Sequence, residues 1–324
     1  MSRAAADWRR FLTGRYAAFR TLAISDAVAV SLGGDSLSIP LVTTLGASPA
    51  LATLIGLLPF LGGMLQALTP TALRRSGGNL RRLTLQIASL GLLRPLLYLG
   101  VVIAIAAEAL PPLAGIFLIA IGFSFGATAQ AIAGANVQTW FGRILPERER
   151  RFVAPRALAV QFGLGSILLV PVALMVRVGE ADLGVLIYAP AFVGALIASL
   201  AFIVALRGLP SPGAVRPARP HAATNLSEPV RRFIRTNTIS AVGAGFAPYL
   251  SVYAIVVLHQ SAAYAILLSA IGSAAALIGA ILIGNWLEHG SASRLYRASL
   301  IASGLSMASS VFAGPWNPYR SEEH

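Results

Sequence analysis

Three ionisable side chains interrupt the apolar segments of this chain, and the rest of the sequence must accommodate their chemistry. Asp26 and Asp35 lie in the first apolar segment, and Arg94 lies in the third. At the rise of an α-helix, Asp35 is about 22 Å beyond Arg20. Arg94 is about 18 Å beyond Arg82 by the same rise, so Asp35 and Arg94 lie at similar depth. A charge inside a bilayer costs about 3 kcal/mol or more. The sequence therefore predicts that each of these side chains lies in a water-filled cavity or has a partner of opposite charge. Asp35 and Arg94 can pair with each other.

Two hydroxyl side chains share a helical face with Asp35. Ser31 and Ser38 stand at helical spacing on either side of it, and such a polar stripe is typical of the wall of a water-filled path. Asp26 precedes Asp35 by nine residues, which places the two on opposite faces, so they are not predicted to form a carboxylate dyad. Asp26 is only about 9 Å beyond Arg20 and can reach the membrane interface.

The fourth apolar segment has a small or amide side chain at every fourth position, which aligns these residues on one face. The glycines predict the close approach of a neighbouring helix. The glutamine side chains are predicted to make either an interhelical hydrogen bond or a contact with a solute. Gln161 in the next segment is a weaker candidate for the same two roles. The stripe consists of Gly122, Gly126, Gln130, Gly134 and Gln138.

Enzymatic chemistry has no support in the sequence. There is no His-Glu-x-x-His motif, no phosphate-binding loop and no cysteine, and the four histidines lie in connections or at the chain end. A serine inside the membrane would therefore have no histidine base beside it. The sequence predicts neither an enzyme nor a metal site nor a cofactor.

The composition requires lipid around these residues. Hydrophobic residues make up 56% of the chain and charged residues 11%, and the mean hydropathy is +0.74, which is too apolar for a soluble surface. An all-α, polytopic membrane protein is predicted, with segments near the ~20 residues that a bilayer requires. The nine predicted spans are 21–45, 49–70, 83–106, 111–138, 157–177, 183–206, 236–258, 262–284 and 297–314.

Arginine sets the predicted orientation. The chain has no lysine, and its basic residues cluster in alternate connections, at 1–20, 74–82, 143–156, 207–235 and 294–297. The positive-inside rule then predicts a multi-pass protein of the cell (inner) membrane, with the N-terminus cytoplasmic and the C-terminus outside. Although the net charge is +13, short clusters between apolar runs indicate topology and not a nucleic-acid partner.

A proline- and arginine-rich stretch divides the chain into three parts. Residues 207–235 cannot bury a core, so they are predicted to be a cytoplasmic linker. An N-terminal six-helix bundle, 1–206, precedes the linker. A partial C-terminal bundle of about three helices, 236–324, follows it.

Two connections resemble the repeated loop motif of the major facilitator superfamily of secondary transporters, Gly-x-x-x-Asp-Arg-x-Gly with basic residues after it. The later connection begins at Gly284, carries Glu288 and reaches Gly290 one residue early. In the earlier connection Pro70 and Arg74 stand where the motif has Gly and Asp. The residues that match there are Arg75, Gly77, Arg81 and Arg82. With six helices, a basic linker and a second set of helices, the resemblance covers about 20–314.

That resemblance implies secondary active transport of a small solute by two bundles that rock around a midplane site. The family's first and fourth helices line its central cavity, which makes Asp35 a candidate for proton coupling or for binding a cationic group, and Gln130 a candidate solute contact. A kink at Pro248 would belong to gating. The implied pathway residues are Asp35, Ser31, Ser38, Arg94, Gln130, Asn237 and Tyr249, and the implied conformational loops hold Arg74, Arg75, Gly77, Arg81, Arg82, Gly284, Glu288 and Gly290.

An alternative follows from the count of nine spans. The family has twelve, so the chain resembles a truncated or split member that lacks transport of its own and serves at most as a membrane-embedded partner. A separately encoded C-terminal fragment or a homodimer would then complete the second bundle. The partners predicted in either case are the lipid bilayer and, for a carrier, a small molecule and protons.

Overall fold

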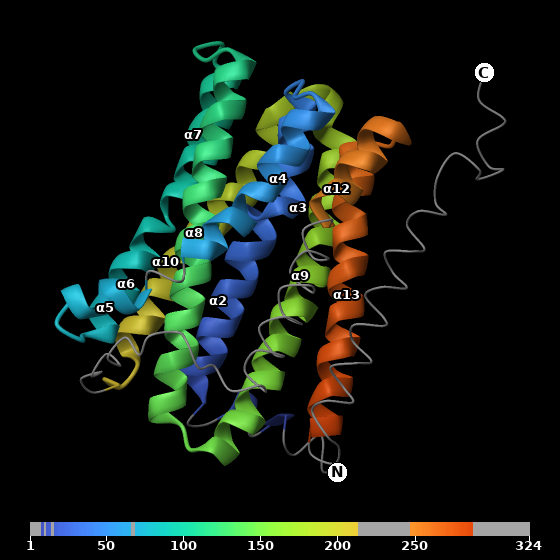
Figure 1. Cartoon of the computed structure of the whole chain (residues 1–324). Helices are drawn as coiled ribbons and strands as arrows, with labels where there is room; N and C mark the ends of the chain where they lie inside the picture. Colours follow the sequence, from blue (N-terminus) through green and yellow to red (C-terminus); the bar gives the residue numbers. More distant parts are fainter. Residues whose placement is uncertain (1–7, 10, 14–15, 66–68, 213–246, 288–324) are drawn as a thin grey trace, which may run out of the picture.

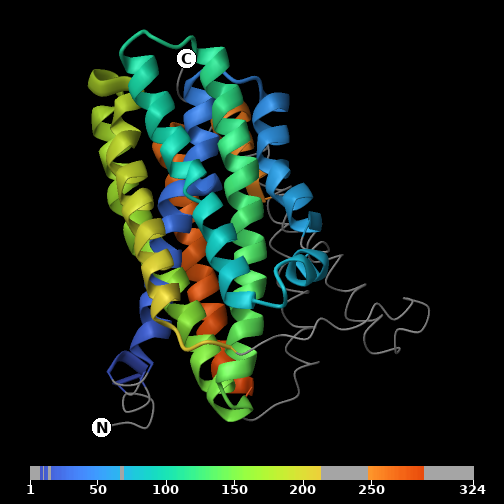
Figure 2. The same ribbon diagram turned by 90° about the vertical axis from the view of Figure 1, so that its left-hand side faces the viewer.

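The computed structural model is a bundle of helices over the residues that it describes, which are 8–9, 11–13, 16–65, 69–212 and 247–287. These residues contain no strand, so the all-α prediction is confirmed for this part of the chain. The helices run side by side along one direction in both views (Figures 1 and 2). Five runs within the described residues are long and apolar enough to cross a membrane, namely Ala17–Thr44, Leu80–Ala106, Pro112–Ile144, Glu147–Gly208 and Ala262–Ile281.

The structure is thus compatible with a multi-pass membrane protein. Nine spans in two bundles remain a prediction, because the ninth predicted span, 297–314, and most of the linker lie outside the described residues. Large apolar side chains point outward from the bundle: Val178 is 78% exposed, Ile167 68% and Val204 65%. A soluble monomer rarely exposes so much apolar surface, whereas lipid solvates it.

The first apolar segment contains a break. It was predicted as one helix over 21–45, but it forms α2 (Ala17–Gly33) and α3 (Asp35–Thr44), with Gly34 extended at ψ −165° between them. A Cβ at Gly34 would lie 2.4 Å from the Val30 carbonyl oxygen, so only glycine fits this bend. Asp35 therefore begins a new helix.

The third segment is interrupted by a turn at Gly91 and Leu92, although Gly91 keeps helical backbone angles, with φ −61° and ψ −21°. Pro95 has no N–H to donate to a preceding turn, and its place in the first turn of the helix that begins at Leu93 costs no helical hydrogen bond. The surrounding elements are α4 (Pro49–Met64), α5 (Thr69–Arg75), α6 (Leu80–Leu90) and α7 (Leu93–Ala106).

Two long helices run in opposite directions and are joined by a turn at Leu145 and Pro146. They are α8 (Pro112–Ile144) and α9 (Glu147–Leu183). A short 3-10 helix, η2 (Gly184–Tyr188), then reverses the chain into α10 (Ala189–Gly208). The later elements are α12 (Ala247–Val252), the π-helical turn η4 (Tyr253–Val257) and α13 (Ala262–Leu287). In Figure 1, α13 runs beside α9.

The described parts of the connections rich in arginine that follow α5, α8 and α10 lie at one end of the bundle. Arg81 Nη2 donates to the carbonyl oxygen of Arg207, and Trp140 Nε1 donates to the carbonyl oxygen of Pro210 over 2.8 Å. At the opposite end the Thr44 hydroxyl donates to the Glu180 carboxylate over 3.0 Å. Alternate connections therefore lie at opposite ends, as the distribution of arginine predicts. We call the first the arginine-rich end.

Two clusters of buried apolar residues fill the bundle. One lies at the end away from the arginines and includes Leu37, Tyr98 and Phe192. The other lies at the arginine-rich end and includes Trp140 and Leu206. Asp26, Arg94 and Gln130 lie between these two clusters.

Candidate functional site

A cavity of about 420 Å³ lies inside the bundle, between α2, α6, α7, α8, α9 and α10. Most of its wall is apolar. Two charged residues line it, Asp26 and Arg94, together with the amides of Gln130, Gln138 and Gln161 and the hydroxyl of Ser199. This volume lies in the range of small-molecule sites, which combine apolar walls with a few convergent polar groups.

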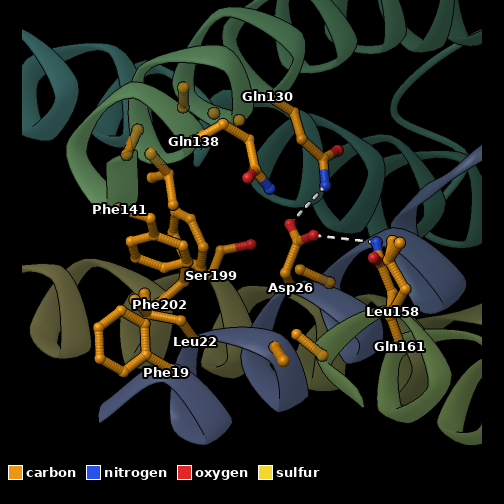
Figure 3. A pocket seen from close by; sticks show the side chains of 18 of the residues that line it. Phe19, Leu22, Asp26, Gln130, Gln138, Phe141, Leu158, Gln161, Ser199 and Phe202 are labelled. Atoms are coloured by element: carbon orange, nitrogen blue, oxygen red, sulfur yellow. Dashed lines mark hydrogen bonds between the residues drawn. The ribbon is translucent and has the colours of Figure 1, made fainter. Parts of the chain in front are cut away.

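Asp26 is the centre of the polar part of the cavity. Its Oδ1 accepts a hydrogen bond from Gln130 Nε2 over 3.0 Å, and its Oδ2 accepts one from Gln161 Nε2 over 3.0 Å. Figure 3 shows the carboxylate between the two amides. One residue of α2 thus bridges α8 and α9. A carboxylate has about four acceptor positions, so two remain after these bonds.

The two glutamines reach Asp26 because they lie at equal depth on the α8–α9 pair. Gln130 is fourteen residues before Ile144, and Gln161 is fourteen residues after Glu147. Both therefore lie about 21 Å from the turn that joins the two helices. This equal spacing was present in the sequence and was the signal that would have identified Gln161 as a partner of Gln130.

Arg94 lies against the same region of α2. Its side chain is 5% exposed, and its Nη2 donates a hydrogen bond of 3.3 Å to the carbonyl oxygen of Ala29. Its Nε has no hydrogen-bond partner among the described residues. No ion pair within 4.0 Å joins it to Asp26 or Asp35, all three being described residues.

Gly126 on α8 makes room for the stem of Arg94. A Cβ added at Gly126 would lie 2.4 Å from Arg94 Cβ and 2.8 Å from its Cδ. A Cβ added at Gly122, one turn earlier, would lie 3.2 Å from Leu97 Cβ. These two glycines of the stripe pack closely on α7. A Cβ added at Gly134 would meet no atom within 4 Å, and Gly134 lines the cavity.

The structure separates Asp35 from this cavity. Asp35 is exposed at the first position of α3, and its Oδ1 accepts a hydrogen bond from its neighbour, the backbone N–H of Ser36. Ser38 is buried on α3 and does not line the cavity. Ser31 faces α9, where a Cβ at Gly165 would lie 2.9 Å from its Oγ.

Of the predicted pathway residues, Gln130 and Arg94 therefore lie in one cavity, and Asp35, Ser31 and Ser38 are not among the residues that line it. Tyr249 belongs to α12, and Asn237 lies outside the described residues. Asp26 was predicted to reach the membrane interface, because its depth was taken from Arg20. The α8 and α9 helices extend well past that level.

The loop residues of the earlier connection have ordinary local roles. Arg74 Nε donates to the Pro70 carbonyl over 3.4 Å, and Gly77 has a φ of +67°, which favours glycine. The N–H of Arg82 donates to the Asn79 side chain, which caps α6. Arg75 ends α5. In the later connection Gly284 lies within α13, while Glu288 and Gly290 lie outside the described residues.

The polar side chains of the cavity can bind a solute. A carboxylate, a guanidinium and three amides can orient a small polar molecule by hydrogen bonds and charge. Among the described residues, no group of His, Asp and Glu is suited to hold a metal ion. No family model matches this chain, and neither a curated protein nor a solved structure matches it. The geometry of the cavity is therefore the basis for the proposal that follows.

Proposed function

We propose that this chain is a secondary active transporter that binds a small solute at Asp26. The observation that carries the proposal is a carboxylate bridged by amides from two other helices, inside a cavity of about 420 Å³ within a bundle of apolar helices. Charges inside a membrane bundle mark solute or ion pathways. The resemblance to the major facilitator superfamily supports the same mechanism, with the helices rocking around a midplane site.

Access to the cavity is proposed from the cytoplasm. The cavity wall continues past Phe19, Phe141 and Val153 toward the arginine-rich end. On the other side of Arg94 the buried cluster around Leu37 and Tyr98 closes the bundle. Under the positive-inside rule the arginine-rich end is cytoplasmic, which makes this a cytoplasm-facing state in the inner membrane.

The hydrogen bonds of Asp26 suggest how binding is linked to movement. They join α2 to α8 and α9. A solute that donates to Asp26, or a proton that neutralises it, competes with the amide N–H groups of Gln130 and Gln161 for the same oxygens. Binding therefore changes the restraints between three helices, and protons are the proposed coupling ion.

Transport by proteoliposomes tests this proposal. The purified chain is reconstituted with a pH-sensitive dye inside, and a panel of labelled amino acids, sugars and organic cations is added under an imposed pH gradient. We expect one class to accumulate, with a proton flux that follows it. The Asp26→Asn variant should lose that uptake, and Glu108→Gln, the same chemical change at an exposed position outside the cavity, should retain it.

Two results would contradict the proposal. One is uptake that survives in Asp26→Asn at the level of Glu108→Gln. The other is the absence of uptake for every class in wild type, which would favour the alternative of a membrane-embedded partner without transport of its own.

A further inference from the structure

The cavity that holds Asp26 presents two opposite charges to whatever occupies it. Asp26 and Arg94 are its only charged residues among the described residues that line it. Neither is neutralised by the other through an ion pair within 4.0 Å. A buried charge without a partner is costly, and an opposite charge that binds next to it with good hydrogen-bond geometry offsets that cost.

Each of the two residues retains unused hydrogen-bonding capacity. The guanidinium of Arg94 is a fork of five N–H donors, of which Nη2 makes a long bond to Ala29 and the buried Nε makes none with the described residues. The Asp26 carboxylate has received two amide donors and can accept about two more. An anion is therefore needed at Arg94, and a donor, best a cationic one, at Asp26.

The spacing of the two charges suits a single small molecule. Arg94 Nη2 is held at the carbonyl of Ala29, three residues after Asp26 on α2. Asp26 and Ala29 are less than one helical turn apart, and both line the cavity. An α-amino acid carries its ammonium and carboxylate groups on one carbon, so one molecule can reach both residues.

The apolar part of the cavity wall is suited to bind an apolar side chain of the solute. Phe19, Phe141 and Phe202 line the cavity toward the arginine-rich end, and aromatic rings bind apolar groups. Building on the proposed transport function, we propose that the solute is a zwitterionic α-amino acid with an apolar side chain, with its ammonium group on Asp26, its carboxylate on Arg94 and its side chain among the phenylalanines.

This assignment is selective against molecules with one charge. A cation without an acidic group satisfies Asp26 but leaves the guanidinium without a partner. An anion without an amine satisfies Arg94 but places a second negative charge near Asp26. Either arrangement loses a charge-assisted hydrogen bond and leaves a buried charge unpaired.

Binding measured without transport tests the inference. The purified chain in nanodiscs of phosphatidylcholine, whose headgroup has no N–H donor, is titrated with L-phenylalanine, L-phenylalaninamide and N-acetyl-L-phenylalanine. We expect L-phenylalanine to bind at least tenfold more tightly than either analogue. Asp26→Asn should weaken its binding at least tenfold and remove the preference over the N-acetyl compound, while Glu108→Gln should keep both.

Arg94→Gln gives the complementary result, which is loss of the preference over the amide. Because the stem of Arg94 packs on α8, Arg94→Gln is first compared with wild type in thermal unfolding. If Arg94→Gln does not fold, the binding selectivity of Asp26→Asn tests the inference. Equal affinities for the three compounds, no binding of any, or an Asp26→Asn variant that binds like wild type would overturn the inference.

Failure of the inference is distinguishable from failure of the transport proposal. If the proteoliposomes accumulate a solute with one charge or none, and Asp26→Asn abolishes that uptake, transport stands and the zwitterion assignment is wrong. If L-phenylalanine binds with the expected selectivity but no solute is moved, the ligand assignment stands and transport is wrong.

Discussion

Gly126 gives the most direct test of how α7 and α8 position the cavity. The Gly126→Ala substitution adds a Cβ that would lie 2.4 Å from Arg94 Cβ, 2.8 Å from Cδ and 3.0 Å from Cγ. Ordinary contact begins near 3.4 Å. The far end of a side chain can turn away from such a clash, but the Cβ of Arg94 is fixed to its backbone. The two helices must therefore separate by about 1 Å at this level, the difference between the normal and the imposed contact.

The cost of that separation follows from the packing on both sides. The α7 face carries the buried residues Tyr98 and Val102, and α8 carries Ile119 and Phe123. A gap of this size forfeits between a quarter and a half of each contact across it, and overpacked cores lose about 1–3 kcal/mol. Alanine recovers about 0.8–1.0 kcal/mol of helix propensity relative to glycine. The expected net loss is about 0–2 kcal/mol relative to wild type, and about 1–3 kcal/mol relative to a glycine-to-alanine change that makes no clash.

Chemical denaturation in mixed micelles measures this loss. Gly100→Ala is the matched control, because it is on α7 and a Cβ there meets nothing within 4 Å. That variant should be as stable as wild type or slightly more stable. Equal stability of Gly126→Ala and Gly100→Ala would refute the close approach of Arg94 to α8.

Three other predictions concern positions away from Asp26. Gly165→Ala should destabilise the protein by about 1–3 kcal/mol through overpacking, because its Cβ would lie 2.9 Å from Ser31 Oγ. The loss should be smaller in a Ser31→Ala background, so denaturation of wild type, the two single variants and the double variant should give a coupling energy of about 0.5 kcal/mol or more. Strict additivity of the two substitutions would contradict the contact. Trp140→Phe should cost about 0.5–1.5 kcal/mol by the same assay, because the indole N–H donates to a backbone carbonyl, and an unchanged stability would exclude that bond. The chain has no cysteine, so an impermeant maleimide on intact cells should label Glu108→Cys but not Arg148→Cys, and the reverse pattern would contradict the proposed orientation.

Composition and segment length were sufficient to predict the helical class, since continuous apolar runs of about 20 residues cross lipid as helices, whereas barrel strands are shorter and alternate in polarity. The distribution of arginine also predicted which connections share an end, and contacts such as that between Arg81 and Arg207 agree with it. Breaks within the predicted spans were missed. The break at Gly34 depends on a backbone contact with Val30, one turn earlier, and a hydropathy pattern does not contain that information.

The candidate site was predicted in part. Gln130 and Arg94 were identified as membrane-embedded polar groups, and both line the cavity. Asp26 was predicted to reach the membrane interface, because its depth was taken from Arg20. The α8 and α9 helices are 33 and 37 residues long, or about 50 Å and more. They extend beyond a bilayer core, so a residue close to Arg20 can lie at the level of their midpoints. Which helices face one another is a tertiary property, and it decides which carboxylate meets the amides.

Comparison of Asp26→Asn with Asp35→Asn tests the central claim most directly. The two substitutions make the same chemical change in adjacent helices, α2 and α3, and only Asp26 lines the cavity. Solute binding and uptake are measured for both variants beside Glu108→Gln. The account predicts that Asp26→Asn weakens binding at least tenfold and abolishes uptake, while Asp35→Asn binds within about threefold of wild type, less than 1 kcal/mol. Loss of binding in Asp35→Asn with binding intact in Asp26→Asn would contradict it.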